Sequence, residues 1–76
     1  MNKEEFERRW QEIAEKSDGY MDAEVVLNDG NVIYCDSYNF IYGRLELYSS
    51  HWLIASVNVS TVESIQYYSV EGDSDE

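Results

Sequence analysis

The feature that most constrains the fold is a change in the spacing of apolar residues near Gly19. Within residues 3–16, Phe6, Trp10 and Ile13 recur at intervals of four and three, which places apolar side chains on one face of a helix. After Gly19, apolar and polar residues alternate, which is typical of half-buried strands. Glycine readily adopts the left-handed backbone that ends many helices. The sequence therefore predicts one helix followed by strands.

Local signals mark the beginning and the surface of this helix. Asn2 and Glu5 have the spacing of a capping box, in which each side chain accepts a hydrogen bond from the other residue's backbone. Two acid–base pairs, Glu5–Arg9 and Glu12–Lys16, stand four residues apart with the acid first, the order that stabilises a helix. We expect the helix to cover about residues 3–16.

The rest of the chain to residue 68 is predicted to form five short strands separated by turns. They are expected at about residues 21–27, 32–42, 45–48, 52–59 and 62–68, with a tight helical turn at Ser60-Thr61. Asp29-Gly30 between the first two strands is a strong hairpin signal. Alternation becomes irregular between residues 36 and 39, so we expect a bend or bulge there. On the fourth strand, one face is predicted to carry Leu53, Ala55, Val57 and Val59, and the other Ile54, Ser56 and Asn58.

The expected fold is α+β and mainly β. It has an N-terminal helix followed by a five-stranded, strongly bent antiparallel sheet or small barrel. Residues 1–70 are too few for more than a single domain. Residues 71–76 are acidic and without large apolar side chains, so we expect a disordered tail. Closure of such a sheet would protect strand edges that otherwise pair with neighbouring molecules.

Three features resemble the small Sm-like and SH3-like barrels: the N-terminal helix, the hairpin over residues 26–33, and the closing segment over residues 57–65. The resemblance covers about residues 3–68 and implies the bent sheet. RNA-binding Sm-like proteins have a glycine in the bent second strand, where this chain has Cys35-Asp36. Their two RNA-binding loops have no convincing match here. The resemblance therefore implies a fold, but no RNA-binding residues.

The charge balance excludes an ordinary nucleic-acid-binding surface. Sixteen acids against five Lys and Arg residues give a net charge of −11, and Arg44 is the only base after residue 16. The acidity is interpreted either as a means of solubility or as a face for a basic partner. Asp22 and Glu24 stand two apart, so on a strand they would share one face. The candidate partner-binding carboxylates are Asp18, Asp22, Glu24 and Asp29.

Tyrosine and tryptophan are unusually abundant. Seven tyrosines and two tryptophans in 76 residues are too many for such a small core to bury completely. Each ring either half-covers the core with its hydroxyl in water, or contributes to a binding surface, where these residues are common. The candidate partner-binding tyrosines are Tyr20, Tyr38 and Tyr42.

Catalytic, metal and membrane functions are not expected. His51 is the only histidine, and the adjacent Ser49 and Ser50 lack the strand–turn–helix setting of a catalytic serine. One histidine, one cysteine and scattered acids lack zinc-ligand spacing, so we expect no metal and no cofactor. Cys35 is interpreted as a small buried residue. The absence of a leader and of a long apolar run favours a cytoplasmic protein without membrane contact.

The leading hypothesis is a non-enzymatic, acidic protein-binding module. It would inhibit or regulate a partner by occupying that partner's basic, nucleic-acid-binding surface, and its size and charge resemble phage and mobile-element inhibitors of host defence. The alternative is an Sm-like or SH3-like structural protomer that forms a homo-oligomer through its edge strands. A third hypothesis is a small-ligand binder with an aromatic-lined cleft at the barrel mouth.

Overall fold

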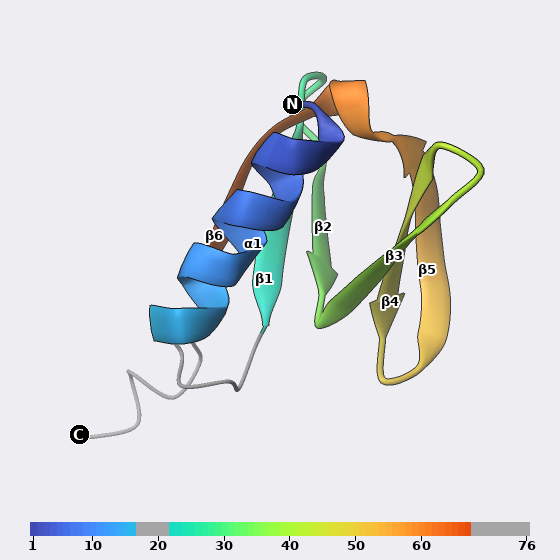
Figure 1. Cartoon of the computed structure of the whole chain (residues 1–76). Coiled ribbons are helices and arrows are strands. Elements are labelled where there is room, and N and C mark those ends of the chain that lie inside the picture. The colour runs from blue at the N-terminus through green and yellow to red at the C-terminus, as the bar shows by residue number, and fades with distance from the viewer. Residues whose placement is uncertain (17–21, 68–76) are drawn as a thin grey trace.

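The computed structural model describes residues 1–16 and 22–67, which form one α-helix and six strands (Figure 1). The elements are α1 (Lys3–Lys16), β1 (Ala23–Leu27), β2 (Val32–Cys35), β3 (Ser37–Ile41), β4 (Arg44–Ser49), β5 (Trp52–Asn58), the short 3₁₀ helix η1 (Val59–Thr61) and β6 (Val62–Tyr67). An α+β fold that is mainly β is therefore confirmed. The predicted acidic tail at 71–76 lies outside the described residues.

The N-terminus of α1 has the hydrogen bonds that the sequence predicts. The Glu5 amide donates to Asn2 Oδ1 at 2.8 Å, and the Asn2 amide donates to Glu5 Oε1 at 2.9 Å. These reciprocal bonds satisfy two backbone donors that a helix terminus leaves without intrahelical partners. Phe6 and Ile13, from the predicted apolar face, are buried. Helix bounds and helix orientation thus follow directly from the local sequence.

The strands form two antiparallel sheets rather than the predicted single sheet of five. Sheet A has the order β2-β1-β6, and sheet B has the order β3-β4-β5. The chain bends at Asp36, between β2 and β3, so the long second strand of the prediction becomes two. The bend is held to β4 and its turn, because the Asp36 amide donates to the Tyr48 carbonyl at 2.9 Å and Asp36 Oδ2 accepts from the Ser50 amide at 3.0 Å.

The sheets do not close into a barrel. β5 and β6 follow one another through η1 but belong to different sheets, and within residues 22–67 they do not pair. The Asn58 side chain caps η1 by accepting from the Ser60 amide at 3.0 Å, so the predicted tight helical turn is confirmed. The turn redirects the chain from sheet B to sheet A (Figure 1).

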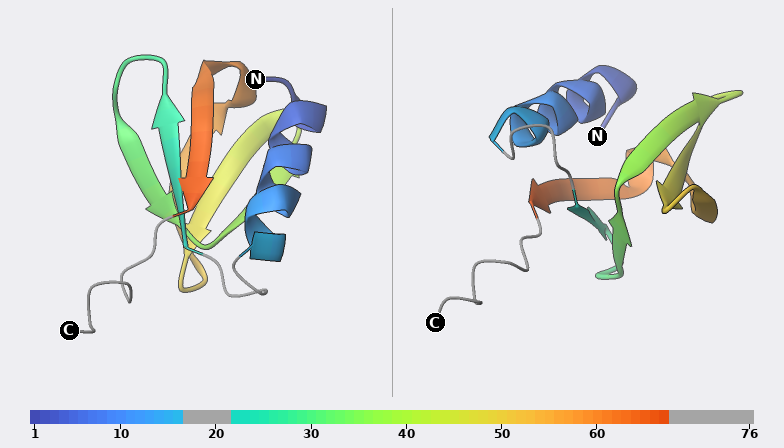
Figure 2. Two further views of the ribbon diagram at one scale, coloured as in Figure 1. Left: turned by 90° about the vertical axis from the view of Figure 1, so that its left-hand side faces the viewer. Right: turned by 90° about the horizontal axis from the view of Figure 1, so that it is seen from below.

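Both sheets and α1 contribute to one hydrophobic core. Its buried members are Phe6, Ile13, Ala23, Val25, Leu27, Cys35, Leu45, Leu47, Val62 and Ile65. α1 runs beside β6 (Figures 1 and 2), and its Phe6 ring lies between the two sheets, with centroids 5.0 Å from Tyr38 and 5.8 Å from Phe40 on β3. The helix therefore joins the inner faces of sheets A and B.

Cys35 is a buried member of this core, as predicted. Burial, together with the nearby carboxylates of Asp36 and Asp22, raises the pKa of its thiol to about 12. A thiol with this pKa is almost entirely protonated at neutral pH. Because the thiolate is the reactive form, Cys35 has a packing role here.

A bulge changes the predicted inside–outside pattern of β5. The register between β4 and β5 shifts between Leu47 and Tyr48, so that Ala55 lies opposite Leu47 but Leu53 lies opposite Tyr48. Leu47 is buried, and its neighbour Tyr48 faces the other side of the sheet. The prediction that Leu53 and Ala55 share one face is therefore wrong, and Leu53 is 53% exposed.

Candidate protein-interaction surfaces

Two of the predicted acidic residues lie together on the outward side of sheet A. Glu24 is in the central strand β1, directly between Tyr34 on β2 and Gln66 on β6. Gln66 Nε2 donates to Glu24 Oε1 at 2.9 Å, which restricts the orientation of this carboxylate. Asp22 precedes Glu24 by two residues and follows the same alternation. We call Asp22, Glu24, Tyr34 and Gln66 the acidic face.

The structure separates Asp29 from the acidic face. Asp29 lies in the β1–β2 turn, at the opposite end of β1 from Asp22. Its Oδ1 accepts from the Asn31 amide and its Oδ2 from Asn31 Nδ2, both at 3.0 Å. Asp29 thus holds the turn together. Asp18 and Tyr20, two further predicted partner-binding residues, lie outside the described residues.

Tyr38 and Tyr42 have opposite environments. The Tyr38 ring packs against α1, with centroids 4.8 Å from Trp10 and 5.0 Å from Phe6. Burial, and to a smaller degree the Glu7 carboxylate, raises the pKa of Tyr38. Tyr42 is 101% exposed at the β3–β4 turn, with a left-handed φ of 50°. Of this pair, Tyr42 is the one whose ring is available to a partner.

Among the described residues, most carboxylates form no ion pair with a basic side chain. Arg44, the only base in residues 22–67, donates from Nη2 to the Ser56 carbonyl at 2.7 Å and from Nε to Ser56 Oγ at 3.0 Å. Within residues 1–16 and 22–67, the one ion pair joins Arg9 and Glu12 at 3.2 Å. The acids of the strand region are Asp22, Glu24, Asp29, Asp36, Glu46 and Glu63. Their field is therefore not cancelled locally.

A second surface, which the sequence analysis missed, lies at the beginning of β5. Trp52, Leu53 and Ile54 are 75%, 53% and 45% exposed, and β5 contains no charged residue. The preceding turn residues, Ser50 and His51, have left-handed φ values of 53° and 73°. Such backbone conformations cost residues other than glycine about 1–3 kcal/mol each and often accompany functional sites. The uncharged run from residue 47 to 62 was the available sequence signal.

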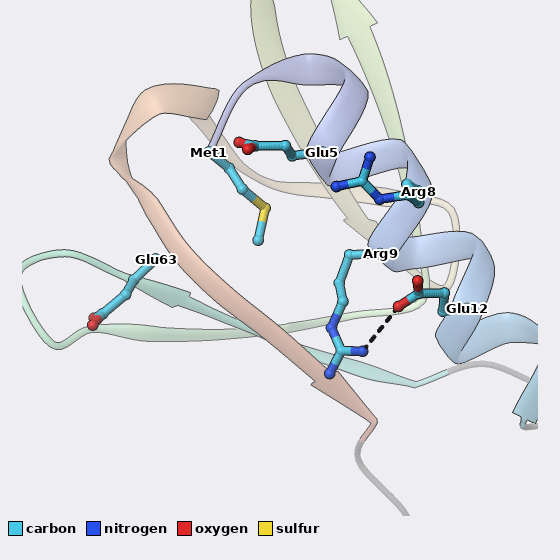
Figure 3. A pocket seen from close by; sticks show the side chains of 6 residues that line it. All are labelled: Met1, Glu5, Arg8, Arg9, Glu12 and Glu63. Atoms are coloured by element: carbon cyan, nitrogen blue, oxygen red, sulfur yellow. Dashed lines mark hydrogen bonds and ion pairs between the residues drawn. The ribbon is translucent and has the colours of Figure 1, made fainter.

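A hollow between α1 and β6 is charged rather than aromatic. It has a volume of about 440 Å³ and is lined by Met1, Glu5, Arg8, Arg9, Glu12 and Glu63. Figure 3 shows Arg9 extending from the helix towards β6, while Glu63 points away from the helix. Arg9 Nε donates to the Ile65 carbonyl at 3.2 Å, so this arginine connects α1 to β6.

A second hollow, of about 420 Å³, lies between the β1–β2 turn and β5. Its lining residues are Leu27, Asn28, Asp29, Arg44, Ser56, Val57, Asn58 and Thr61. No tyrosine or tryptophan lines either hollow, so neither is the aromatic-lined cleft that a small-ligand binder was expected to have.

The described residues show no constellation for metal binding or for membrane crossing. No group of three or more His, Cys, Asp or Glu side chains within residues 1–16 and 22–67 could hold a metal ion. In the same part of the chain, no helix is long and apolar enough to cross a membrane. Comparisons with protein-family profiles, with curated proteins and with solved structures find no match to this chain. The surfaces described above are therefore the basis for assigning a function.

Proposed function

We propose that this chain is a non-enzymatic protein-binding module whose acidic face binds a basic surface of a partner protein. The observation that supports this best is the unequal use of charge in the strand region. Arg44 is bonded to Ser56, while six carboxylates of residues 22–67 have no basic side chain in an ion pair within the described residues. A surface of this kind attracts cationic partners and repels nucleic acid.

The position of Glu24 suits such a contact. A central strand is among the more rigid parts of a sheet, and the hydrogen bond from Gln66 further restricts the carboxylate. Carboxylates fixed on a rigid support can occupy sites that otherwise bind phosphates, and basic nucleic-acid-binding surfaces are rich in such sites. Tyr34, which is 53% exposed beside Glu24, adds an aromatic contact of the type found at binding hot spots. The module would then act as an inhibitor or regulator.

The acidic face can be tested by titrating isotope-labelled protein with a synthetic oligolysine peptide, following amide chemical shifts. We expect the largest shifts around Asp22, Glu24, Tyr34 and Gln66. The double variant Asp22→Lys/Glu24→Lys should bind the peptide at least about tenfold more weakly, because two charge contacts of about 1–2 kcal/mol are lost. Affinity of the unmodified chain should fall steeply with added salt.

The matched control is Glu7→Lys/Glu15→Lys, which reverses two exposed acids on α1. Each double variant changes the net charge by the same amount, from −11 to −7, because each reversal adds two positive units. We expect the α1 variant to retain most of the binding. Equal losses in both variants, or shifts spread evenly over all surfaces, would show that the acidic face is not a specific site.

A second candidate function is the Sm-like or SH3-like protomer that oligomerises through edge strands. What supports it is the strand order: sheets A and B, read as β6-β1-β2 and β3-β4-β5, meet at the Asp36 bend like the halves of one strongly bent sheet. A second support is β5, an edge strand of seven residues with exposed apolar side chains.

A further inference from the structure

The edges of the two sheets differ in how well they are protected. At β6, α1 covers the backbone: Arg9 Nε donates to the Ile65 carbonyl at 3.2 Å, and the Met1 nitrogen donates to the Val62 carbonyl at 3.0 Å. β6 also carries the exposed Glu63. A covering helix and a charged residue are two common ways in which proteins prevent an edge strand from pairing with another molecule.

The edges of β2 and β3 are protected by their length and by the bend. β2 has four residues and β3 has five, and the chain changes direction at Asp36 between them. The inward side chains of β3 pack under α1 through Tyr38 and Phe40. Short edges that turn away from a straight line are poor templates for another strand.

Along its first half, β5 has no covering helix within the part of the chain that the structure describes, no charged side chain and no change of chain direction, and the bulge at Ile54 is its one irregularity. It continues for seven residues without a charged side chain. Towards its end, the Ser56 carbonyl accepts a hydrogen bond from Arg44. Between Trp52 and Ala55, no side chain among the described residues bonds to the β5 backbone. We call Trp52, Leu53, Ile54 and Ala55 the β5 edge.

We propose that the β5 edge pairs with the β5 edge of a second copy of this chain. The two strands would run antiparallel about a twofold axis near Leu53 and Ile54, which joins two three-stranded sheets B into one sheet of six strands. Main-chain hydrogen bonds between the edges would provide the pairing. The exposed apolar side chains beside the axis would lose contact with water, which supplies the favourable free energy.

Charge and symmetry favour a second copy as the occupant. Two chains of net charge −11 repel each other over most of their surfaces. At β5 no carboxylates would face one another, because the strand is uncharged. A twofold contact uses the same edge on both copies and leaves no free β5 edge for a third copy. Head-to-tail pairing of β5 with β6 would instead require displacement of Arg9 from the Ile65 carbonyl.

This inference is independent of the proposed acidic face. The β5 edge belongs to sheet B and the acidic face belongs to sheet A. Pairing through β5 would leave both acidic faces accessible, so that one dimer could contact two basic sites and gain avidity. Failure of either proposal would leave the other standing, because molecular mass reports on β5 and the oligolysine shifts report on sheet A.

The first experiment measures molecular mass by light scattering over a range of protein concentrations. We expect the unmodified chain to be a dimer and Ile54→Lys to be a monomer with an unchanged circular dichroism spectrum. The matched control is Val32→Lys on β2, where the original side chain is 41% exposed compared with 45% for Ile54. The control should remain a dimer. An unmodified chain that is monomeric at high micromolar concentration would overturn the proposal. It would be overturned equally if such a monomer bound an extended segment of another protein at β5.

The second experiment introduces single cysteines at Leu53, Ile54 or Ala55 and applies a mild oxidant. Directly opposed residues on antiparallel strands have Cα atoms about 4.5–5.5 Å apart, a distance that a disulfide can span. We expect covalent dimers from at least one of these variants, with little background because Cys35 is buried and its thiol has a pKa of about 12. Glu63→Cys on β6 is the negative control. Two results would refute the twofold arrangement. One is a cross-link between a Leu53→Cys chain and a Glu63→Cys chain when the two are mixed, and the other is the absence of covalent dimers from all three β5 variants.

Discussion

Replacement of Phe6 with alanine should cause the largest loss of stability of any single change in α1. Phe6 is completely buried, and its ring lies within 6 Å of three other aromatic rings: the centroid distances are 5.0 Å to Tyr38, 5.8 Å to Phe40 and 5.8 Å to Trp10. Truncation of a buried phenylalanine to alanine typically costs about 3–5 kcal/mol. Each aromatic pair contributes about 0.5–1.5 kcal/mol beyond area burial, so we expect a value near the upper limit, about 4–5 kcal/mol.

That loss is large compared with the total stability of a small domain. At about 0.05–0.15 kcal/mol per residue, a chain of 76 residues has a free energy of unfolding of about 4–11 kcal/mol. Phe6→Ala should therefore lose between about two fifths and all of the free energy of unfolding, and it is partly unfolded at room temperature if the unmodified chain lies at the lower end of this range. Phe6→Leu keeps most of the apolar volume but removes the ring contacts, so we expect it to lose only about 1–2 kcal/mol.

The assay is urea denaturation followed by tryptophan fluorescence and circular dichroism. Trp10 is in contact with Phe6 and Tyr38, so its fluorescence should report on the docking of α1, and circular dichroism follows unfolding independently of Trp52. Tyr42→Ala, at a completely exposed position, should change stability by less than about 0.5 kcal/mol. A loss below about 1 kcal/mol for Phe6→Ala would refute the docking of α1 between the two sheets.

The remaining predictions concern two local features of the structure, the buried thiol of Cys35 and the left-handed turn at Gly30. In the folded protein, Cys35 should resist thiol-specific reagents at neutral pH, because burial raises its pKa to about 12. Its raised pKa also makes the folded state less stable above about pH 9, where the unfolded thiol ionises first. Urea unfolding between about pH 9 and pH 10 should show a slope of up to about 1.4 kcal/mol per pH unit, most of which is lost in Cys35→Ala. Gly30→Ala should lower the melting temperature and cost about 1 kcal/mol, because Gly30 has a φ of 93° in open space and the cost is therefore backbone strain. An unchanged melting temperature would contradict the left-handed turn.

The parts of the fold that depend on nearby residues could be predicted from the sequence. The capping bonds between Asn2 and Glu5, the apolar face of α1 and the tight turn capped by Asn58 each require only a few consecutive residues. The irregular alternation after Cys35 also indicated the bend correctly. Its consequence, division of the strands into two sheets, depends on which strands pair on each side of Asp36, and alternation carries no information about pairing partners.

The β5 edge was missed for the same reason. The bulge opposite Leu47 and Tyr48 exists only in the pairing of β4 with β5, and it moves Leu53 to the face opposite that of Ala55. The left-handed conformations of Ser50 and His51 were equally hidden, because glycine or asparagine would be the usual sign of them. Alternation therefore placed Leu53 on the same face as Ala55 and did not reveal the exposed apolar edge.

The acidic residues show that composition alone does not say which candidate residues lie together. The net charge of −11 gave the sign of the expected partner, but Asp29 is bonded within its own turn, and only Asp22 and Glu24 lie together among the described candidates. The structure also places the uncharged β5 on sheet B, away from the strand that carries Glu24. If both surfaces bind, charge reversal on sheet A should change affinity for cations without changing molecular mass, and Ile54→Lys should do the opposite. The two variants should change different properties because the acidic face lies on sheet A and the β5 edge lies on sheet B.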